Sequence, residues 1–325
     1  MLIERQAKPT LTAVEMDRGD TLRFTRMDGG VVTIVVRETH AKMLQTTLTV
    51  PKVEQPRALT ALHFHARVEV DGIPLLMNRE VGTSQSFYEP WEIAGIRLWL
   101  DAVDDLFEFM DETHGACRPR KHVRLALQDA TLRICPSLIH PWCPLPEEGL
   151  AIGECYNGDD CWMGPYFGAS AHGGLDINHP RGTPIWAPLD FDDQWLFNRV
   201  PEAENNRWRG VHVWPDGSVW TLQVHHLIRL TVPEHTPVRA GQQIADGAGV
   251  WVGDHDHSHF VFKVRPGGDP APSEATSGRE LGSDDILLDP WILFWQMYRD
   301  RSAHPACFYR RAETGPYRGH YELKG

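Results

Sequence analysis

An imidazole and a carboxylate stand four residues apart in the middle of the chain, at His172 and Asp176. They lie in a glycine-rich stretch, residues 170–188, which contains a short apolar run. On an extended segment, side chains at positions i and i+4 point to the same face, so this pair is able to converge on one point. A histidine nitrogen and a carboxylate oxygen suit Zn²⁺. Because the chain has 17 histidines, such a pair also arises by chance, and its meaning depends on the segments that follow.

The net charge and the distribution of apolar residues argue against two classes of partner. The formal net charge is −12 at pH 7. Broad nucleic-acid binding requires a basic face, so we expect no nucleic-acid partner. No apolar run reaches the roughly 18 residues of a spanning helix, so we expect no membrane span. No signal peptide is visible at the N-terminus; either the protein stays inside the cell, or the chain begins after a removed leader.

The cysteines favour the second of these alternatives. Five of the six lie between Cys117 and Cys161, in a stretch rich in loop-forming residues, and the sixth is Cys307. An even number of clustered cysteines is typical of disulfides in an oxidising compartment. We therefore expect a secreted or periplasmic protein whose disulfide connectivity is open, with free thiols in a reducing cytosol as the alternative. No Cys-x2-Cys pair occurs, so a structural zinc knuckle is not expected.

The first part of the chain, residues 1–130, is predicted to be a β-sandwich-like module. Short runs of alternating or β-branched residues are separated by turn signals, a pattern typical of such folds. The turn Asp71-Gly72 predicts a two-residue hairpin, and residues 27–30 predict another. The expected strands are residues 20–26, 31–36, 61–70, 73–77 and 96–101.

The remainder of the chain is predicted to form a second, larger domain. Residues 131–160 are rich in Pro and Cys and are expected to be a linker, and residues 161–325 the second domain, with a core at 165–265. Short strands and turns dominate this core. Pro290 suits the first turn of a helix, so a C-terminal helical tail is expected from there. The predicted fold is therefore mainly β throughout, with one helix near the end.

Five segments of the second domain follow one another in an order that resembles the lysostaphin-like zinc endopeptidases, peptidase family M23. The family has a His-x-Gly-(hydrophobic)-Asp segment, a Gly-Thr-Pro run, a His-Leu pair, a Gly-Gln-x-(hydrophobic) stretch and a closing His-x-His-Phe. The resemblance covers roughly residues 160–265 and implies an antiparallel-β peptidase domain. Here the segments read His172-Gly173-Gly174-Leu175-Asp176, Gly182-Thr183-Pro184-Ile185-Trp186-Ala187, His226-Leu227, Gly241-Gln242-Gln243-Ile244 and His257-Ser258-His259-Phe260.

The resemblance implies a complete catalytic zinc site. Its zinc ligands would be His172, Asp176 and His259, with water in the open fourth position. His226 and His257 would be the catalytic histidines that act on this water and on the tetrahedral oxyanion, and the division of labour between them stays open. His225, next to His226 on an extended strand, is expected to point to the opposite face and to be structural.

The function implied is a zinc metalloendopeptidase that hydrolyses peptide bonds in peptidoglycan stems or cross-links. Two alternatives stay open: a zinc-site protein that binds cell-wall peptides or activates another hydrolase without cleaving, and an endopeptidase that acts on proteins. Residues 1–130 would bind substrate or cover the groove.

The chain departs from the family at Val224, where Tyr is usual, at Ala169, where Arg is common, and in a long insertion that runs to about Arg209. We expect these departures to affect the rim of the groove and not the metal ligands. The scissile bond and the oligomeric state are not indicated by the sequence.

Overall fold

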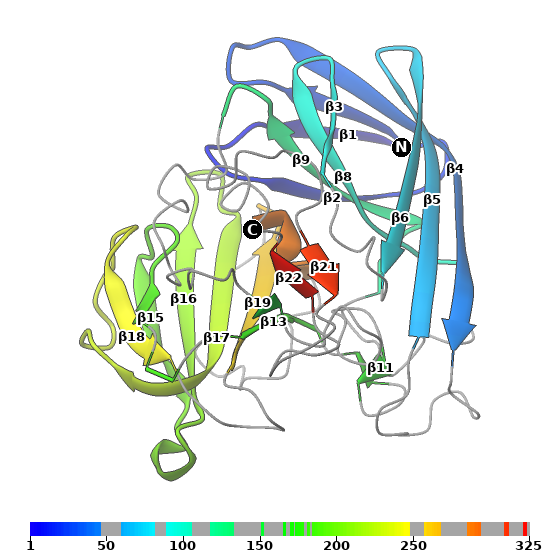
Figure 1. The fold of residues 1–325 in the computed structure, drawn as a ribbon. Coiled ribbons are helices and arrows are strands. Elements are labelled where there is room, and N and C mark those ends of the chain that lie inside the picture. Colours follow the sequence, from blue (N-terminus) through cyan, green and yellow to red (C-terminus); the bar gives the residue numbers. More distant parts are fainter. Residues whose placement is uncertain are drawn as a thin grey trace.

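The structure is a computed structural model that describes residues 1–46, 60–81, 89–105, 118–132, 151–152, 165–166, 170–171, 173–178, 181–182, 184–247, 257–267, 285–293, 309–311 and 321–323. These residues form a mainly β protein, as predicted, with an N-terminal part and a second part that lie side by side (Figure 1). All six cysteines and His172 lie outside the described residues, so the disulfide prediction is not tested. None of the helical residues described forms a segment long and apolar enough to span a membrane.

The N-terminal part consists of two sheets packed face to face. The five-stranded sheet has the order β1 (Leu2–Gln6), β3 (Thr21–Thr25), β4 (Val31–Thr46), β5 (Thr60–Val70), β6 (Ile73–Val81). The four-stranded sheet has the order β2 (Thr12–Met16), β9 (Val123–Asp129), β8 (Ile96–Val103), β7 (Trp91–Ile93). Side chains of both sheets, among them Phe24, Phe64 and Leu125, share one buried core. The sandwich-like arrangement and its predicted hairpins are confirmed.

The second part is built on a sheet of eleven strands among the described residues, in which β17 (Val219–Leu230) and β19 (His257–Arg265) are neighbours. The main path also contains β14 (Pro184–Trp186), β18 (Gln243–Gly247), β13 (Leu175–Asn178), β10 (Ala151–Ile152), β22 (Tyr321–Leu323) and β21 (Tyr309–Arg311). Strands β15 (Asp193–Asn198), β16 (Asn206–Val213) and β20 (Ile286–Leu288) extend it, and β11 (Pro165–Tyr166) pairs separately with β12 (Ser170–Ala171). Of the predicted C-terminal helix, residues 291–293 are described and form one helical turn.

The four-stranded sheet is the shared middle layer of the molecule. Every residue of β9 is buried. Leu125 and Leu127 belong to the N-terminal core, whereas Ala126 belongs to the core of the second part. Trp99 of β8 likewise packs with the second part. Because successive side chains of a strand point to opposite faces, this sheet is covered by the five-stranded sheet on one side and by the second part on the other.

Buried charges also join the two parts. Arg79 of β6, Asp101 of β8 and Asp289 after β20 have fully buried side chains and form ion pairs. The Asp289 N–H donates to Asp101 Oδ1 at 3.1 Å, and Asp289 Oδ1 accepts from the N–H of Trp291 at 2.9 Å. Arg124 of β9 donates to Asp101 Oδ2 at 2.7 Å. The cluster therefore connects both N-terminal sheets with the turn that follows β20.

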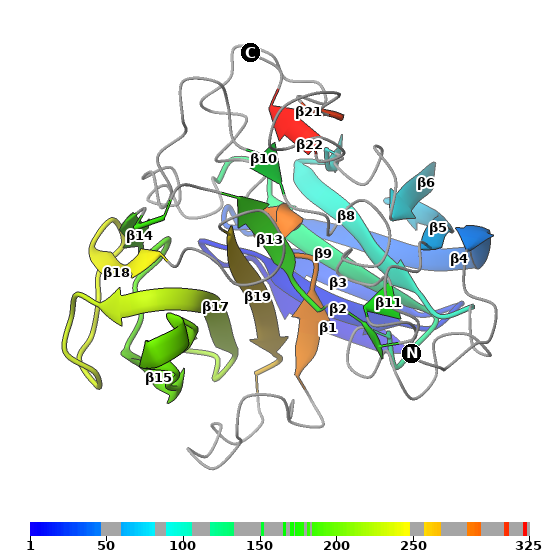
Figure 2. The ribbon, with the colours of Figure 1, turned by 60° about the horizontal axis from the view of Figure 1, so that its bottom comes forward.

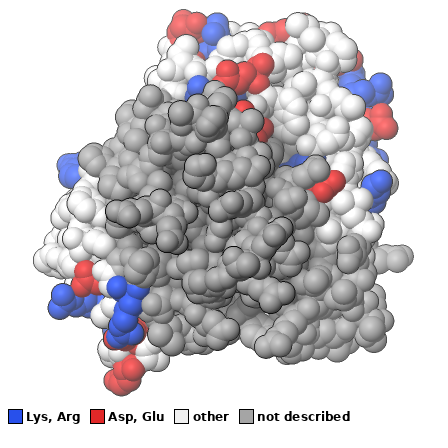
Figure 3. All heavy atoms as spheres, in the orientation of Figure 1, with Lys and Arg blue, Asp and Glu red and all other residues white. Residues whose placement is uncertain are grey.

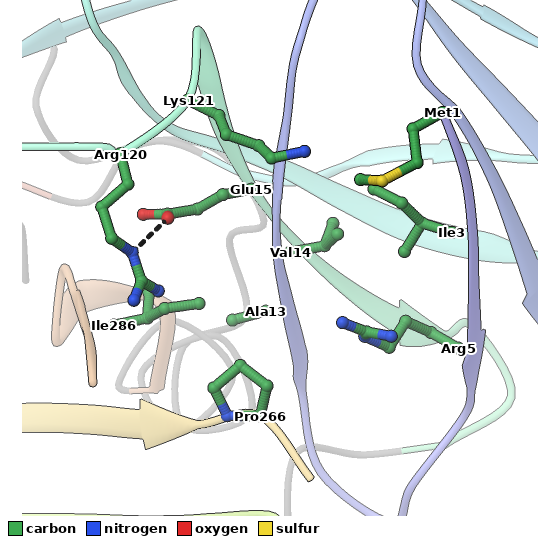
Figure 4. A pocket seen from close by; sticks show the side chains of 10 residues that line it. All are labelled: Met1, Ile3, Arg5, Ala13, Val14, Glu15, Arg120, Lys121, Pro266 and Ile286. Carbon is green, nitrogen blue, oxygen red and sulfur yellow. Dashed lines mark hydrogen bonds and ion pairs between the residues drawn. The ribbon is translucent and has the colours of Figure 1, made fainter. Parts of the chain in front are cut away.

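Surface features at the described residues are modest. A cavity of about 390 Å³ lies where the two parts meet, with Arg5, Glu15 and Pro266 in its lining, and Arg120 pairs there with Glu15 at 2.8 Å (Figure 4). On the face seen in Figure 3, Lys and Arg side chains alternate with Asp and Glu side chains. The described residues of this face thus present no extended basic area.

Candidate active site

Strand β19 is the centre of the candidate site, with β13 on one side and β17 on the other (Figure 2). The register places Asp176 directly opposite His259, and His225 opposite His259 from the other side. Positions directly opposite in neighbouring strands share a face of the sheet. Positions 176, 259 and 225 therefore form a row across three strands, on one face. Position 257 shares that face, because it is two residues from 259 along β19.

A β-bulge lies at the two consecutive histidines of β17. His226 has a φ of 65°, and the pairing of β16 with β17 shifts between Asn206 and Trp208. Such a bulge leaves an extra residue in one strand and re-aims the side chains next to it. As a result, the ring centres of His225 and His226 are 4.7 Å and 6.4 Å from that of His259. The prediction that His225 points away from the site was wrong, because the bulge breaks the alternation on which it rested.

The ring of His226 is held by an asparagine from the insertion. His226 Nδ1 lies 2.7 Å from Asn205 Oδ1, and both residues are buried. An amide oxygen accepts hydrogen bonds, so Nδ1 carries the proton in the neutral ring and Nε2 is the nitrogen with the lone pair. The neighbouring Asn206 donates through Nδ2 to the carbonyl oxygens of Leu227 and Ile228, at 3.0 Å and 2.9 Å. The two asparagines thus hold both the ring and the backbone that follows it.

Sequence reasoning missed this role of the insertion. Residues 190–209 were expected to affect the rim of the groove, whereas β15, a short 3-10 helix (Pro201–Ala203) and β16 form a hairpin that pairs with β17. Asn205 lies directly before β16. No local sequence signal marks its contact with His226, because the two residues are 21 positions apart and meet only through strand pairing.

The insertion also places aromatic rings beside the histidines. Phe197 of β15 meets the ring of His225 edge to face, with ring centres 5.7 Å apart. The Arg209 guanidinium lies 4.7 Å from the Phe197 ring centre and 5.6 Å from that of Trp195. Burial lowers the pKa of Arg209, although a guanidinium stays charged under any ordinary condition. This strip forms a half-buried wall next to β17.

His259 packs on a glycine of the motif around position 172. A Cβ atom at Gly174 would lie 2.3 Å from His259 Cε1 and 2.6 Å from the carbonyl oxygen of Phe260. These distances are far shorter than any ordinary contact, so the position accepts no larger residue without movement of the ring. The glycine of the His-x-Gly-(hydrophobic)-Asp segment therefore has a physical reason: it lets the His259 ring lie against the neighbouring backbone.

We expect Gly174→Ala to displace the His259 ring. The variant should lower zinc affinity by about 10–100-fold, the cost typical of disturbed orientation around a metal ligand. Competition with a chelator, with the metal content of both proteins measured, checks this. A control is Gly182→Ala on the surface, where no atom lies within 4 Å of the added Cβ and only the φ of +75° is strained. Equal zinc affinity in Gly174→Ala and the wild type would contradict the prediction.

Burial sets the protonation state of the His225 ring. Its Nε2 atom is buried and has no hydrogen-bond partner in the described part of the structure. Burial lowers the pKa of His225 well below its ordinary value, and the neighbouring His259 and His226 rings lower it further. The ring is therefore neutral, the form in which an imidazole binds a metal ion.

The donors available to a metal ion fit zinc only in part within the described residues. No group of three or more His, Cys, Asp or Glu side chains able to hold a metal is found among those residues. His172 and the side chains of Asp176 and His257 lie outside them, so the predicted ligand set and the role of His257 are not tested. The buried, unpartnered imidazole nitrogen of His225 next to His259, and the position of Asp176 opposite His259, fit a zinc site.

The N-terminal part reaches the same face of β19 as the histidines. Val261, two residues after His259, packs in the N-terminal core together with Leu287 of β20. A Cβ atom at Gly173 would lie 3.6 Å from Leu287 Cδ2. The N-terminal part thus borders the row of histidine positions, about 7 Å along the strand, at two residues of strand rise.

No protein-family model and no curated protein matches the chain. Solved structures that are similar include the catalytic domain of the antimicrobial peptidase lysostaphin from Staphylococcus simulans, at 23% identity over 30% of this chain and 69% of that one, with a TM-score of 0.25. The chain spans 53% of a longer lysostaphin structure. The catalytic domain of a prophage-encoded M23 protein, EnpA, from Enterococcus faecalis matches at 24% identity over 30% and 71% of the two chains, with a TM-score of 0.24.

A zinc-containing peptidase from Vibrio cholerae is similar over a larger share of the two chains, 77% and 81%, at 12% identity and a TM-score of 0.28. Lysostaphin and the M23 protein EnpA are of the same group that the sequence motifs resemble. Their TM-scores and identities are too low to add to what the motifs and the site indicate about this chain.

Proposed function

We propose that this chain is a zinc metalloendopeptidase that hydrolyses peptide bonds in peptidoglycan stems or cross-links. The observation that carries the proposal is the row of positions 176, 259 and 225 across three strands, with His226 held beside it by Asn205. This arrangement joins two motifs that are more than 80 residues apart in the sequence. The order and flanks of those motifs resemble family M23, which supports the choice of substrate class.

In this proposal, His172, Asp176 and His259 hold the zinc ion, and His226 and His257 act on the reacting atoms. Zinc, when bound, polarises the scissile carbonyl and lowers the pKa of a water molecule toward neutrality. The Asn205 contact leaves His226 Nε2 able to accept a proton or, once protonated, to donate to a developing oxyanion. His226 and His259 are both almost completely buried, which keeps bulk water from competing for these hydrogen bonds.

Phe197, which meets the ring of His225, and the N-terminal part border the row of histidines. We propose that they are the walls of an open groove in which a flexible peptide lies. The substrate is outside the cytoplasmic membrane, so the proposal includes a secreted or periplasmic location. The partner in this proposal is the peptidoglycan or peptide substrate.

Purified sacculi incubated with the wild type and with His257→Ala test the proposal. We expect new peptide termini, detected by mass spectrometry, with the wild type only, and about one zinc ion per chain in both, as an open three-ligand site predicts. Cleavage of a protein substrate but not of sacculi would replace the substrate class. Absence of cleavage of either substrate at full zinc content would favour a protein that binds cell-wall peptides without cleaving them.

A further inference from the structure

We propose that a groove between the edges of the two N-terminal sheets binds an extended peptide that carries a carboxylate, and that Arg5 holds this carboxylate. The groove consists of the cavity of about 390 Å³ at the junction of the two parts and a second cavity of about 540 Å³. Arg5, Ala13 and Pro266 line both cavities, which are therefore neighbours. The inference goes beyond the proposed function, because it concerns a second site at which no bond is broken.

The groove follows two strands that are the last of their sheets. In the part of the chain that the structure describes, β1 ends the five-stranded sheet and β2 ends the four-stranded sheet. Residues 3–6 of β1 and residues 12–15 of β2 line the groove, and Val264 and Pro266 of the second part complete it. Val264 lies five residues beyond His259, or about 17 Å along β19. The groove is thus separate from the row of histidine positions.

Cations outnumber carboxylates in the lining of this groove. Among the described residues, five Lys and Arg side chains and three carboxylates line the two cavities. Each carboxylate has a cation from the same lining: Glu4 pairs with Arg23 at 3.0 Å, Glu15 with Arg120 at 2.8 Å and Asp216 with Lys8 at 2.7 Å. Lys121 pairs with Asp20 at 3.0 Å.

Arg5 differs from these four cations. Its Nη1 donates to the backbone carbonyl oxygen of Glu4 at 2.9 Å, and it forms no ion pair with any described residue. Arg5 is half-buried, and its guanidinium extends from β1 into the cavity, toward Ala13 and Pro266 (Figure 4). A positive charge without a counter-charge therefore faces the space that the two cavities share.

The chemistry of the guanidinium selects the anion. Its N–H donors form a planar fork that matches a carboxylate through two parallel hydrogen bonds. The contact with the Glu4 carbonyl uses one donor, so the fork of Arg5 keeps donors for a ligand. Partial burial reduces the screening by water, which strengthens the attraction between the two charges.

The shape and lining of the groove favour a peptide over a single small anion. Each cavity has a volume in the range of ligand pockets. The outer edge of a sheet presents backbone N–H and C=O groups to which an extended peptide can add as a further strand. Ile3, Val14 and Ile286 provide apolar contacts beside Arg5. An acidic residue flanked by apolar residues, in an extended segment, is complementary to this lining.

Isothermal titration of the full chain with acetyl-Thr-Val-Glu-Val-Thr-amide tests the inference, and the glutamine counterpart of this peptide is the comparison ligand. We expect the glutamate peptide to bind at least about 10-fold more tightly than the glutamine peptide. In Arg5→Gln its affinity should fall by about 10–100-fold, the loss typical of a hydrogen bond to a charged group. The matched control is Arg67→Gln in β5, where Arg67 pairs with Glu38 at 3.2 Å and both side chains are more than half exposed. This control should bind like the wild type.

Thermal unfolding shows whether both variants fold. Equal affinity of the wild type for the two peptides, or unchanged binding of the glutamate peptide by folded Arg5→Gln, would overturn the inference. No binding by the wild type at millimolar peptide would overturn it as well. Displacement of the peptide by an equal concentration of inorganic phosphate would also overturn it, because Arg5 would then be a general anion site.

The assay on sacculi gives a separate result. Peptide bound at Arg5 by a chain that cleaves nothing would leave the inference standing and overturn the proposed function. Cleavage of sacculi by a chain that binds no peptide at Arg5 would do the reverse.

Discussion

Replacing His226 by alanine is expected to lower kcat for peptidoglycan cleavage by about 10²–10⁴-fold, the usual contribution of a positioned acid or base. Zinc content should stay at the wild-type level, because the proposed role of His226 is proton transfer and not metal binding. The physical reason is the hydrogen bond of its Nδ1 to Asn205 at 2.7 Å, which fixes the orientation of a ring whose centre lies 6.4 Å from that of His259. Single-turnover kinetics gives the rate of cleavage, and metal analysis of the same preparations gives the zinc content per chain.

A matched control is His65→Ala in the N-terminal part. His65 forms the same kind of contact, from Nδ1 to the Asn78 side-chain oxygen at 3.0 Å, on an exposed face of β5. This variant should cleave at the wild-type rate. If His226→Ala kept a normal kcat, or lost its zinc together with its activity, the assignment of His226 as a catalytic residue would be wrong.

Replacing Arg79 by methionine is expected to destabilise the protein by about 3–5 kcal/mol, because it leaves a buried carboxylate without its counter-charge. Arg79 pairs with Asp289, donates to the carbonyl oxygen of Asp101 at 2.5 Å and is completely buried. Asp101 also receives a hydrogen bond from Arg124, whereas Arg79 is the cation paired with Asp289 among the described ion pairs. The loss of stability should therefore arise mainly from Asp289, since Asp101 keeps its hydrogen bond from Arg124.

The free energy of unfolding of Arg79→Met and of a surface control, measured in urea, checks this. The control is Arg37→Met, whose partner Glu69 lies at 2.6 Å with both side chains exposed by a third or more. Exposed pairs contribute about 0–1 kcal/mol, so the control should unfold almost like the wild type. Equal losses in the free energy of unfolding of the two variants would show that the buried cluster stabilises the protein no more than an exposed ion pair does.

Several parts of the fold were predictable because they depend on local chemistry. The pair Asp71-Gly72 has φ values of 48° and 80°, the left-handed conformations that a two-residue hairpin turn requires and that Asp and Gly tolerate. It joins β5 and β6 where the sequence placed a hairpin. Residues 96–101 form most of β8, which also follows from local chemistry, because their side chains alternate or are apolar and favour strands.

The arrangement of the site was predictable only in part. The motifs indicated which residues belong to it, and the register confirms that the strands of Asp176 and His259 are neighbours. The bulge at His226 was not predictable, because it depends on how β16 and β18 pair with β17 and not on the residues at the bulge themselves. This single irregularity decides where the ring of His225 lies relative to that of His259.

The burial of β9 on both of its faces could also not be predicted from the sequence. A strand covered on both faces is usually apolar throughout, yet β9 contains Arg124, Gln128 and Asp129. These polar residues have partners elsewhere in the fold, such as Asp101 for Arg124 and the N–H of Met27 for Asp129. Such partners are set by tertiary packing, so alternation alone could not assign the strand to a middle layer.

That middle layer makes the N-terminal part inseparable from the rest. If residues 1–130 were deleted, the core that contains Phe262, Leu222 and Trp220 would lose Leu11, Ala13, Trp99 and Ala126, and Asp289 would lose its ion pair with Arg79. The two parts of the chain are thus not independent folding units. A graft of the second half onto another carrier, or a swap of the first half for a foreign binding domain, would have to bring β2, β8 and β9 along as part of the graft.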